Sequence, residues 1–249
     1  MKFLVSVFLS ITLSLSLALS VQAQQQNTDQ SAQLQEIEQL LRQNPEVIPS
    51  VLDSLKSYIE NKAAAQKRSA EHGAWLLEND DTHPWFGAKE SALEIVVFTD
   101  YDCPYCKRLE PHLQKLVSEY EQLKVINIMT PLRQGEVEGG KLNPAGYALN
   151  VWQNQPKQFA EVHELLYAKS GLHTQRSLEQ IARRTGTRSQ LQSVNATPTI
   201  LKRNYQVFRD FGLNGTPAMI IGGRIIPGYV EYADLEKVVV EALEQAPSN

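Results

Sequence analysis

Cysteine is nearly absent from this chain, which has only two cysteines, Cys103 and Cys106, among 249 residues. A small secreted protein held together by disulfide bonds would carry many more, so that class is excluded. No second C-x-x-C motif and no clustered pair of histidines accompanies the two cysteines, so no metal site is expected. Their C-x-x-C spacing indicates that the sulfur atoms take part in a reaction and are not there for stability.

The sequence also lacks an excess of basic charge. Lysine and arginine number 24 against 28 acidic residues, for a formal net charge of −4. Nucleic-acid-binding proteins concentrate basic residues, so no nucleic-acid partner is expected. Hydrophobic residues make up 42% of the chain, which is enough for a domain folded around a core.

The first 23 residues have the pattern of an export signal. Lys2 supplies a positive charge, residues 3–18 form an apolar run, and Val21-Gln22-Ala23 fits a signal peptidase site. We expect export with cleavage after Ala23; an uncleaved membrane anchor is the alternative for the same run. No later segment is long and apolar enough to span a bilayer.

Residues 24–73 predict an N-terminal helical extension. A Gln-rich tract leads into an apolar stripe at helical spacing, and Asn44 and Pro45 interrupt that stripe. A second stripe with heptad spacing follows at Ile48, Leu52, Leu55 and Ile59. This helix either packs on its own domain or associates with other copies of the chain. Gly73 is expected to end the extension.

The rest of the chain alternates between strand and helix patterns. Apolar runs at 93–98 and 123–128 predict two strands, and a helical pattern lies between them, so residues 74–130 form a β-α-β unit with parallel strands. Residues 131–212 read as a helical insertion that is too long for a loop. Residues 213–249 complete the domain with a hairpin around Gly222-Gly223 and a last helix.

The two cysteines lie where the first of these strands meets its helix. Unpaired N–H groups and the helix dipole stabilise an anion at a helix start, and the thiolate is the form of cysteine that attacks disulfides. Cys106 shares a helical stripe with Leu109 and Leu113, so it faces the core, whereas Cys103 at the helix tip can meet a substrate. We expect Cys103 to be the nucleophile and Cys106 to resolve the mixed disulfide. A structural disulfide and a copper or zinc ligand pair are the alternatives.

Three segments resemble the DsbA-type thioredoxin superfamily. Residues 98–107, Phe-Thr-Asp-Tyr-Asp-Cys-Pro-Tyr-Cys-Lys, resemble its active-site segment, with Pro111 at the position of the proline that kinks the active-site helix. Residues 215–218, Gly-Thr-Pro-Ala, resemble its cis-proline loop, and residues 159–167 resemble a helix of its inserted domain.

This resemblance covers residues 44 to about 244 and implies an α/β thioredoxin fold with an inserted α-helical domain and the N-terminal helical extension. It implies that Cys103 and Cys106 are catalytic. It also implies that Pro104, Tyr105, Thr216 and Pro217 shape the client-binding site. The family's proline at the position of Pro217 follows a cis peptide bond, although most X–Pro bonds are trans.

Within the superfamily the chain is most similar to ScsC-like and Com1-like proteins. Asn-Pro-Glu-Val at residues 44–47 resembles their N-terminal extension, through which some members form trimers and act as disulfide isomerases. The resemblance implies a periplasmic thiol–disulfide oxidoreductase that needs no cofactor and acts on cysteine-containing client proteins. It further implies a DsbB-like or DsbD-like membrane redox partner and a homo-oligomer formed through the N-terminal helices.

The dipeptide between the cysteines bears on the direction of the reaction. Pro104-Tyr105, with Thr216 before Pro217, is similar to DsbG-type isomerases, whereas DsbA oxidases carry Pro-His. Tyr105 supplies no cation to the thiolate, so we expect a weaker oxidant than DsbA. A DsbA-like dithiol oxidase is the first alternative, and a copper-binding periplasmic chaperone is the alternative from another class.

The sequence departs from the superfamily at one position. Thioredoxin and DsbA have a buried acid six residues before the first cysteine, where this chain has Val97. Asp100 and Asp102 lie near the motif and are expected to be solvated loop acids. The five histidines, at positions 72, 83, 112, 163 and 173, are expected to be surface or packing residues.

Overall fold

The computed structural model describes residues 31–78, 80–133, 142–192 and 196–245. The chain forms two compact units, Met1–Glu60 and Asn61–Asn249. The predicted signal segment and its cleavage site lie outside the described residues. Over the described ranges, no helix is both long enough and apolar enough to cross a membrane.

The first unit is helical where it is described. A helix at 31–43 is followed by the short 3₁₀ helix η1 (Pro45–Val47) and by the start of α2 (Ile48–Leu77). Pro45 opens η1, at a helix start where the missing N–H costs nothing. The stripe residues are exposed, with Leu34 at 67%, Leu55 at 52% and Ile59 at 56%. The predicted break at Asn44-Pro45 is therefore confirmed, and the stripes carry unburied apolar surface.

The second unit begins within α2, which runs through Gly73 to Leu77. The predicted end of the helix at Gly73 was wrong. The turn around Gly73 buries His72 and Leu76, and Leu76 belongs to a core that includes Val96 and Phe98. This burial offsets the cost of about 1 kcal/mol that glycine imposes inside a helix.

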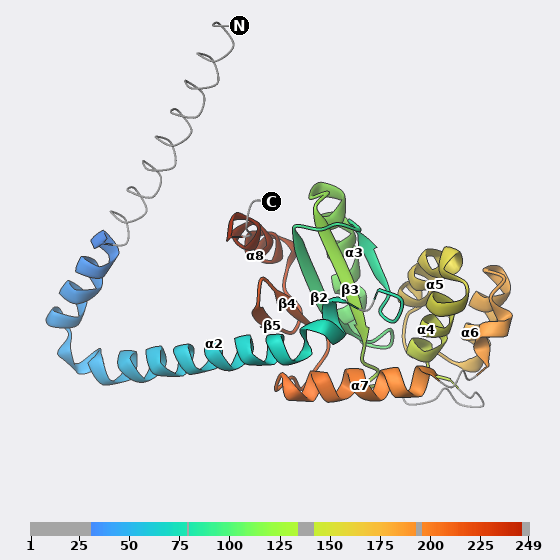
Figure 1. Ribbon diagram of the computed structural model, residues 1–249, viewed down its shortest axis with the longest axis horizontal. Helices are drawn as coiled ribbons and strands as arrows, with labels where there is room; N and C mark the ends of the chain where they lie inside the picture. Colours follow the sequence, from blue (N-terminus) through green and yellow to red (C-terminus); the bar gives the residue numbers. More distant parts are fainter. Residues whose placement is uncertain (1–30, 79, 134–141, 193–195, 246–249) are drawn as a thin grey trace, which may run out of the picture. The chain divides into compact units, whose positions relative to one another are not determined.

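Five strands form one sheet in the order β1-β3-β2-β4-β5 (Figure 1). They are β1 (Trp85–Gly87), β2 (Leu93–Thr99), β3 (Leu123–Met129), β4 (Ala218–Ile221) and β5 (Arg224–Pro227). Strands β2 and β3 are parallel, as the β-α-β pattern predicts, and the other neighbouring pairs are antiparallel. Gly222 and Gly223 turn the β4–β5 hairpin with φ values of 54° and 77°, in the region that favours glycine.

Helices cover both faces of the sheet. On one face, α3 (Pro104–Glu119) and α8 (Tyr232–Gln245) pack against Ile95 and Val97 of β2. On the other face, α7 (Ala196–Asp210) packs against Val96 and Phe98. Successive residues of a strand point to opposite faces, so a strand covered on both faces is apolar throughout. This explains why β2 reads as a continuous apolar run.

The inserted helices form a second core beside the sheet (Figure 1). They are α4 (Pro144–Asn154), α5 (Pro156–Ala168), α6 (Gln175–Arg184) and the short η2 (Arg188–Leu191). Their core includes Tyr101 and both cysteines, so the insertion packs directly on the C-x-x-C segment. Helix α7 lies in the range predicted as insertion, yet it buries Val207 and Phe208 against the sheet. The α/β fold with an inserted helical domain is confirmed.

Candidate active site

Cys103 and Cys106 lie at the start of α3. Cys103 is the N-cap in extended conformation, and Pro104 occupies the first turn, where proline is favoured. Cys106 is 2% exposed and lies on the buried face of α3 with Leu109 and Leu113, as predicted. Cys103 is only 6% exposed, so it is less accessible than its place at the helix tip suggested.

The loop before β4 covers Cys103. The Thr216–Pro217 bond is cis, and the Cys103 thiol donates a hydrogen bond to the Thr216 carbonyl over an Sγ–O distance of 3.1 Å. Ala218, the next residue, pairs with Phe98 in the adjacent strand β2. This pairing holds a loop that is more than one hundred residues away in sequence against the cysteine pair.

The two thiols have opposite electrostatic environments. A hydrogen bond from the Cys106 side chain lowers the pKa of Cys103 to about 5; burial opposes the shift, and the N–H groups of Cys106 and Tyr105 reinforce it. Burial raises the pKa of Cys106 well above its ordinary value, and the neighbouring Cys103 raises it further. Both cysteines are free thiols in this structure. At neutral pH the pair therefore holds one thiolate, on Cys103, and one proton, on Cys106.

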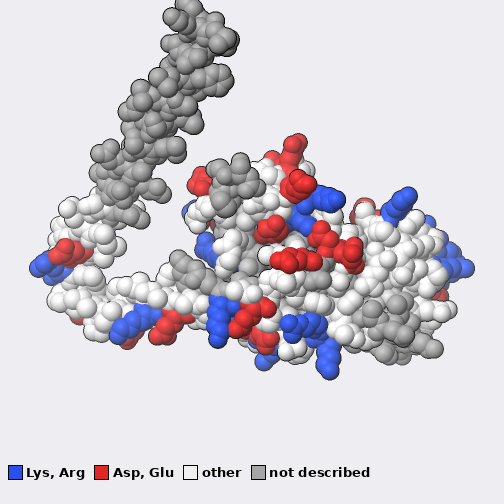
Figure 2. All heavy atoms as spheres, viewed as in Figure 1, with Lys and Arg blue, Asp and Glu red and all other residues white. Residues whose placement is uncertain are grey.

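Aromatic rings extend from the motif across the surface. Tyr105 is 55% exposed, its ring centroid lies 6.2 Å from that of Tyr229, and the Arg108 guanidinium lies 4.5 Å above the Tyr229 ring. His112 contacts the rings of Tyr229 and Tyr232, consistent with the expectation that it does not touch the cysteines. Over the face seen in Figure 2, acidic and basic side chains are interspersed.

Asp100 and Asp102 are buried, at 2% and 3% exposure, so the prediction of solvated acids was wrong. The Asp100 carboxylate accepts hydrogen bonds from the backbone N–H groups of Asp102, Leu132 and Arg133. Asp102 accepts one from the N–H of His173. Leu132, Arg133 and His173 come from distant segments, so both acids act as clamps that tie the motif to the loop after β3 and to the insertion.

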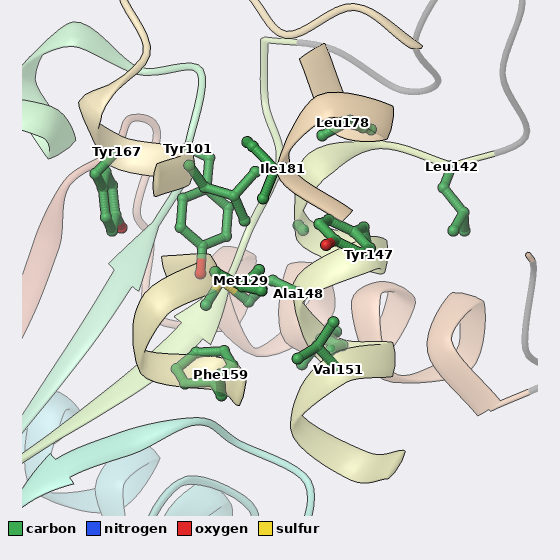
Figure 3. Packing of buried hydrophobic residues seen from close by; sticks show 14 of the residues in the cluster. Tyr101, Met129, Leu142, Tyr147, Ala148, Val151, Phe159, Tyr167, Leu178 and Ile181 are labelled. Carbon is green, nitrogen blue, oxygen red and sulfur yellow. The ribbon is translucent and has the colours of Figure 1, made fainter. Parts of the chain in front are cut away.

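A polar network lies behind Cys106. The Thr99 and Tyr167 hydroxyls are 2.6 Å apart, the Tyr101 hydroxyl lies 2.7 Å from His163 Nδ1, and His163 Nε2 lies 3.1 Å from Glu110 Oε1. Burial raises the pKa of Glu110, but the charge of His163 and its hydrogen bond outweigh this and lower the pKa overall. Figure 3 shows Tyr101 and Tyr167 in the core built by the insertion, with ring centroids 4.6 Å apart.

Sequence reasoning missed this network. His163 and Tyr167 lie within the helix segment that resembles the inserted domain, four residues apart and therefore on one face of α5. That spacing was a usable signal, but Tyr167 pairs with Thr99 of β2 and His163 pairs with Tyr101 and Glu110, and only the packing of α5 on the motif brings these partners together. Four of the five histidines are buried, which fits the packing role expected for them.

The arrangement suits thiol–disulfide exchange. The Cys103 thiolate can react with a disulfide beside exposed aromatic rings and a proline loop. The protonated thiol of Cys106 lies buried behind Cys103 and can react next. Within the described part of the chain, no three His, Cys, Asp or Glu residues gather in a way that could hold a metal ion.

The chain matches the thioredoxin family over residues 79–241. It is similar to a solved periplasmic thioredoxin-like protein from Salmonella enterica serovar Typhimurium, at 38% identity and a TM-score of 0.63, covering 69% of this chain and 95% of that one. The catalytic domain of Proteus mirabilis ScsC is 35% identical with a TM-score of 0.65, covering 72% of this chain and 98% of that one. Disulfide bond formation protein D of Bacillus subtilis strain 168 is 25% identical over 182 residues, which are 65% of this chain and 77% of that protein.

The family match covers more than half of the chain, and the ScsC domain is covered almost completely by a similar sequence and fold. The chain therefore belongs to the thioredoxin family, among the thiol–disulfide oxidoreductases of the Dsb and ScsC type.

Proposed function

We propose that this protein is an exported disulfide isomerase that exchanges disulfides with client proteins through the Cys103–Cys106 pair. Cys103 attacks the client disulfide, and Cys106 resolves the mixed disulfide that forms. The observation that carries the proposal is that the pKa values of the two thiols are shifted in opposite directions. The pKa of Cys103 is lowered to about 5, and the pKa of the buried Cys106 is raised.

The surroundings of Cys103 support a client-binding role for four more residues. Tyr105 is exposed two residues after Cys103, and the cis Thr216–Pro217 loop contacts the Cys103 sulfur. Pro104 keeps Cys103 at the N-cap of α3. These residues surround the Cys103 sulfur, so an extended client segment that brings a disulfide to Cys103 would meet them.

The isomerase assignment rests on Tyr105 and on the N-terminal stripe. Tyr105 brings no cation to the thiolate, which makes the disulfide form a weaker oxidant than a histidine at that place would. The exposed apolar stripe at Ile48, Leu52, Leu55 and Ile59 supports assembly through the extension, since such surfaces usually mark interfaces. An oligomer holds several redox sites around one client, so a mixed disulfide can be attacked again before release.

The proposal places the protein in the periplasm, where disulfides persist. Its support is the signal-like pattern of residues 1–23 together with the similarity to a periplasmic thioredoxin-like protein. Clients are proteins with cysteines, and a DsbB-like or DsbD-like membrane protein recycles the pair.

The test compares the parent with Cys103→Ala and Cys106→Ala in insulin reduction and in refolding of scrambled ribonuclease. We expect Cys103→Ala to abolish both activities. We expect Cys106→Ala to accumulate a covalent complex with the client, because nothing resolves the mixed disulfide. Equal activity of Cys103→Ala and the parent would overturn the redox proposal. If the parent reduces insulin but does not refold scrambled ribonuclease, the dithiol oxidase becomes the better assignment.

A further inference from the structure

Cys106 must lose its proton when it resolves the mixed disulfide, yet it is 2% exposed and this chain has Val97 in place of the buried acid of thioredoxin and DsbA. A thiol in apolar surroundings is a poor nucleophile, because burial penalises the thiolate. Some group in the interior has to stabilise the negative charge that develops on Cys106.

The charged side chains of the cysteine segment and of α3 named above already have hydrogen-bond partners. Both carboxylate oxygens of Asp100 accept backbone N–H groups, and Asp102 accepts the N–H of His173. Glu110 is bonded to His163 and Gln114, and His163 is also bonded to the Tyr101 hydroxyl. The Lys107 ammonium donates to the carbonyls of Lys169 and Gly171, so it ties the end of α5 to α3.

Two neutral hydroxyl groups, those of Thr99 and Tyr167, lie in the buried core beside Cys106. Thr99 lies at the end of β2 and is 2% exposed. Burial raises the pKa of Cys106, and the Thr99 side chain opposes that rise as a hydrogen-bond partner. The Thr99 hydroxyl lies 2.6 Å from the hydroxyl of Tyr167, which comes from α5 and is 7% exposed. Cys106 and Tyr167 also belong to the same buried core, so polar groups from a strand and two helices adjoin one another: Tyr167, Thr99 and Cys106.

We infer that Tyr167 and Thr99 form a two-hydroxyl donor chain that stabilises the Cys106 thiolate in the resolving step. This inference rests on the proposed roles of Cys103 and Cys106. Thr99 touches the reacting sulfur and donates to it, and Tyr167 is a positioning residue that donates to Thr99. Hydrogen bonds in such a chain polarise one another, so the outer hydroxyl strengthens the inner one. Burial raises the pKa of Tyr167 well above its ordinary value, so this hydroxyl keeps its proton and remains a donor.

The step balances without a further reactant. Cys106 attacks Cys103 Sγ, the Cys103–Cys106 disulfide forms, and the bond from Cys103 to the client sulfur breaks. The pair is oxidised and the client disulfide is reduced by two electrons. The proton lost by Cys106 is matched by the proton that the departing client thiolate takes up from solvent.

The test uses Ellman's reagent in stopped flow with the reduced full chain, because one trace reports both steps. Attack by Cys103 releases the first coloured thiolate at a rate that depends on reagent concentration. Displacement by Cys106 releases the second at a rate that does not. The variants are Thr99→Val, which replaces the hydroxyl with a methyl group of similar shape; Thr99→Ser, which keeps it; and Tyr167→Phe.

We expect Thr99→Val to slow the second phase about tenfold or more at neutral pH, the effect of one lost hydrogen bond to a charged group. Tyr167→Phe should slow it less, and Thr99→Ser should restore most of the rate. In Thr99→Val the pH profile of the second phase should be displaced to higher pH than in the parent, because more hydroxide is needed to form the thiolate. The first phase should be unchanged in all three variants.

Tyr147→Phe is the matched control, since it removes a buried tyrosine–threonine hydrogen bond in the same core, to Thr187, away from the cysteines. It should lower stability without changing the second phase. A parent-like second phase in both Thr99→Val and Tyr167→Phe, with both phases intact in the parent, would overturn this inference and leave the proposed function standing. Absence of the first phase from the parent would instead overturn the proposed function.

Discussion

At the scale of single residues, the acidity of Cys103 depends on donors that meet its sulfur. Besides Cys106 and the α3 backbone, the Thr216 hydroxyl lowers the pKa of this cysteine. The reactivity of Cys103 should therefore rise with pH through a midpoint of about 5 and level off above it. Iodoacetamide alkylation of the reduced protein across this range measures the midpoint.

Thr216→Val should raise that midpoint, by about one pKa unit, because one donor to the thiolate is lost. Thr197→Val is the control, since its buried hydroxyl bonds with Asn150 in the insertion and not with the cysteines. An unchanged midpoint in Thr216→Val would mean that the hydroxyl does not reach the thiolate in solution.

We expect the residue between Pro104 and Cys106 to influence the redox potential of the pair. Tyr105→His places an ionisable cation beside the thiolate and should make the potential more oxidising by about 30 mV or more. Equilibration of each protein with glutathione buffers measures the potential. Tyr205→His, on an exposed tyrosine of α7, should leave it unchanged. A parent potential at or above about −120 mV would contradict the expected isomerase poise.

At the scale of elements, the site depends on segments that are held together by buried acids. Asp100→Asn removes an acceptor from the carboxylate that binds three backbone N–H groups, at distances of 2.9 to 3.0 Å. We expect the free energy of unfolding to fall by about 2 kcal/mol, because a buried N–H loses a charged partner. Urea unfolding of the oxidised protein measures the loss.

Asp53→Asn, on an exposed face of α2, is the control for removing one negative charge. It should change the free energy of unfolding by less than about 0.5 kcal/mol. If Asp100→Asn is equally mild, the clamp contributes little to stability and the burial of Asp100 needs another explanation.

At the scale of the whole molecule, we predict that the N-terminal extension determines whether the chain is a monomer or an oligomer. Leu52 and Leu55 are 46% and 52% exposed on the heptad-spaced stripe. We expect the mature chain to associate and the double variant Leu52→Glu, Leu55→Glu to be monomeric, because charges would be buried at the interface. Light scattering gives the mass of each.

The same double variant should lose refolding of scrambled ribonuclease while it keeps insulin reduction, which needs only one redox site. Ser57→Glu, at an exposed polar position of the same helix, should change neither. A monomeric parent would favour the alternative in which the helix packs on its own domain. Refolding that survives in a monomeric double variant would separate assembly from isomerase activity.

The sequence by itself was sufficient for features that depend on local pattern. The apolar run of β2, the helix after Cys103, the Gly222-Gly223 turn and the buried side of Cys106 all follow from short-range periodicity and helix geometry. The motif order also indicated the thioredoxin fold, because each motif marks a local backbone conformation that the fold requires.

Only the tertiary structure decided features that depend on distant partners. Asp100 looked like a loop acid, since its N–H partners at Leu132 and Arg133 come after β3. Gly73 looked like a helix end, since the burial of Leu76 in the core of the second unit is invisible to local propensity. The group of Tyr167, Thr99 and Cys106 joins α5, β2 and α3, and packing of the insertion on the sheet is what creates it. Local pattern sets which face of an element is apolar, whereas the pairing of buried polar groups is set by which faces meet.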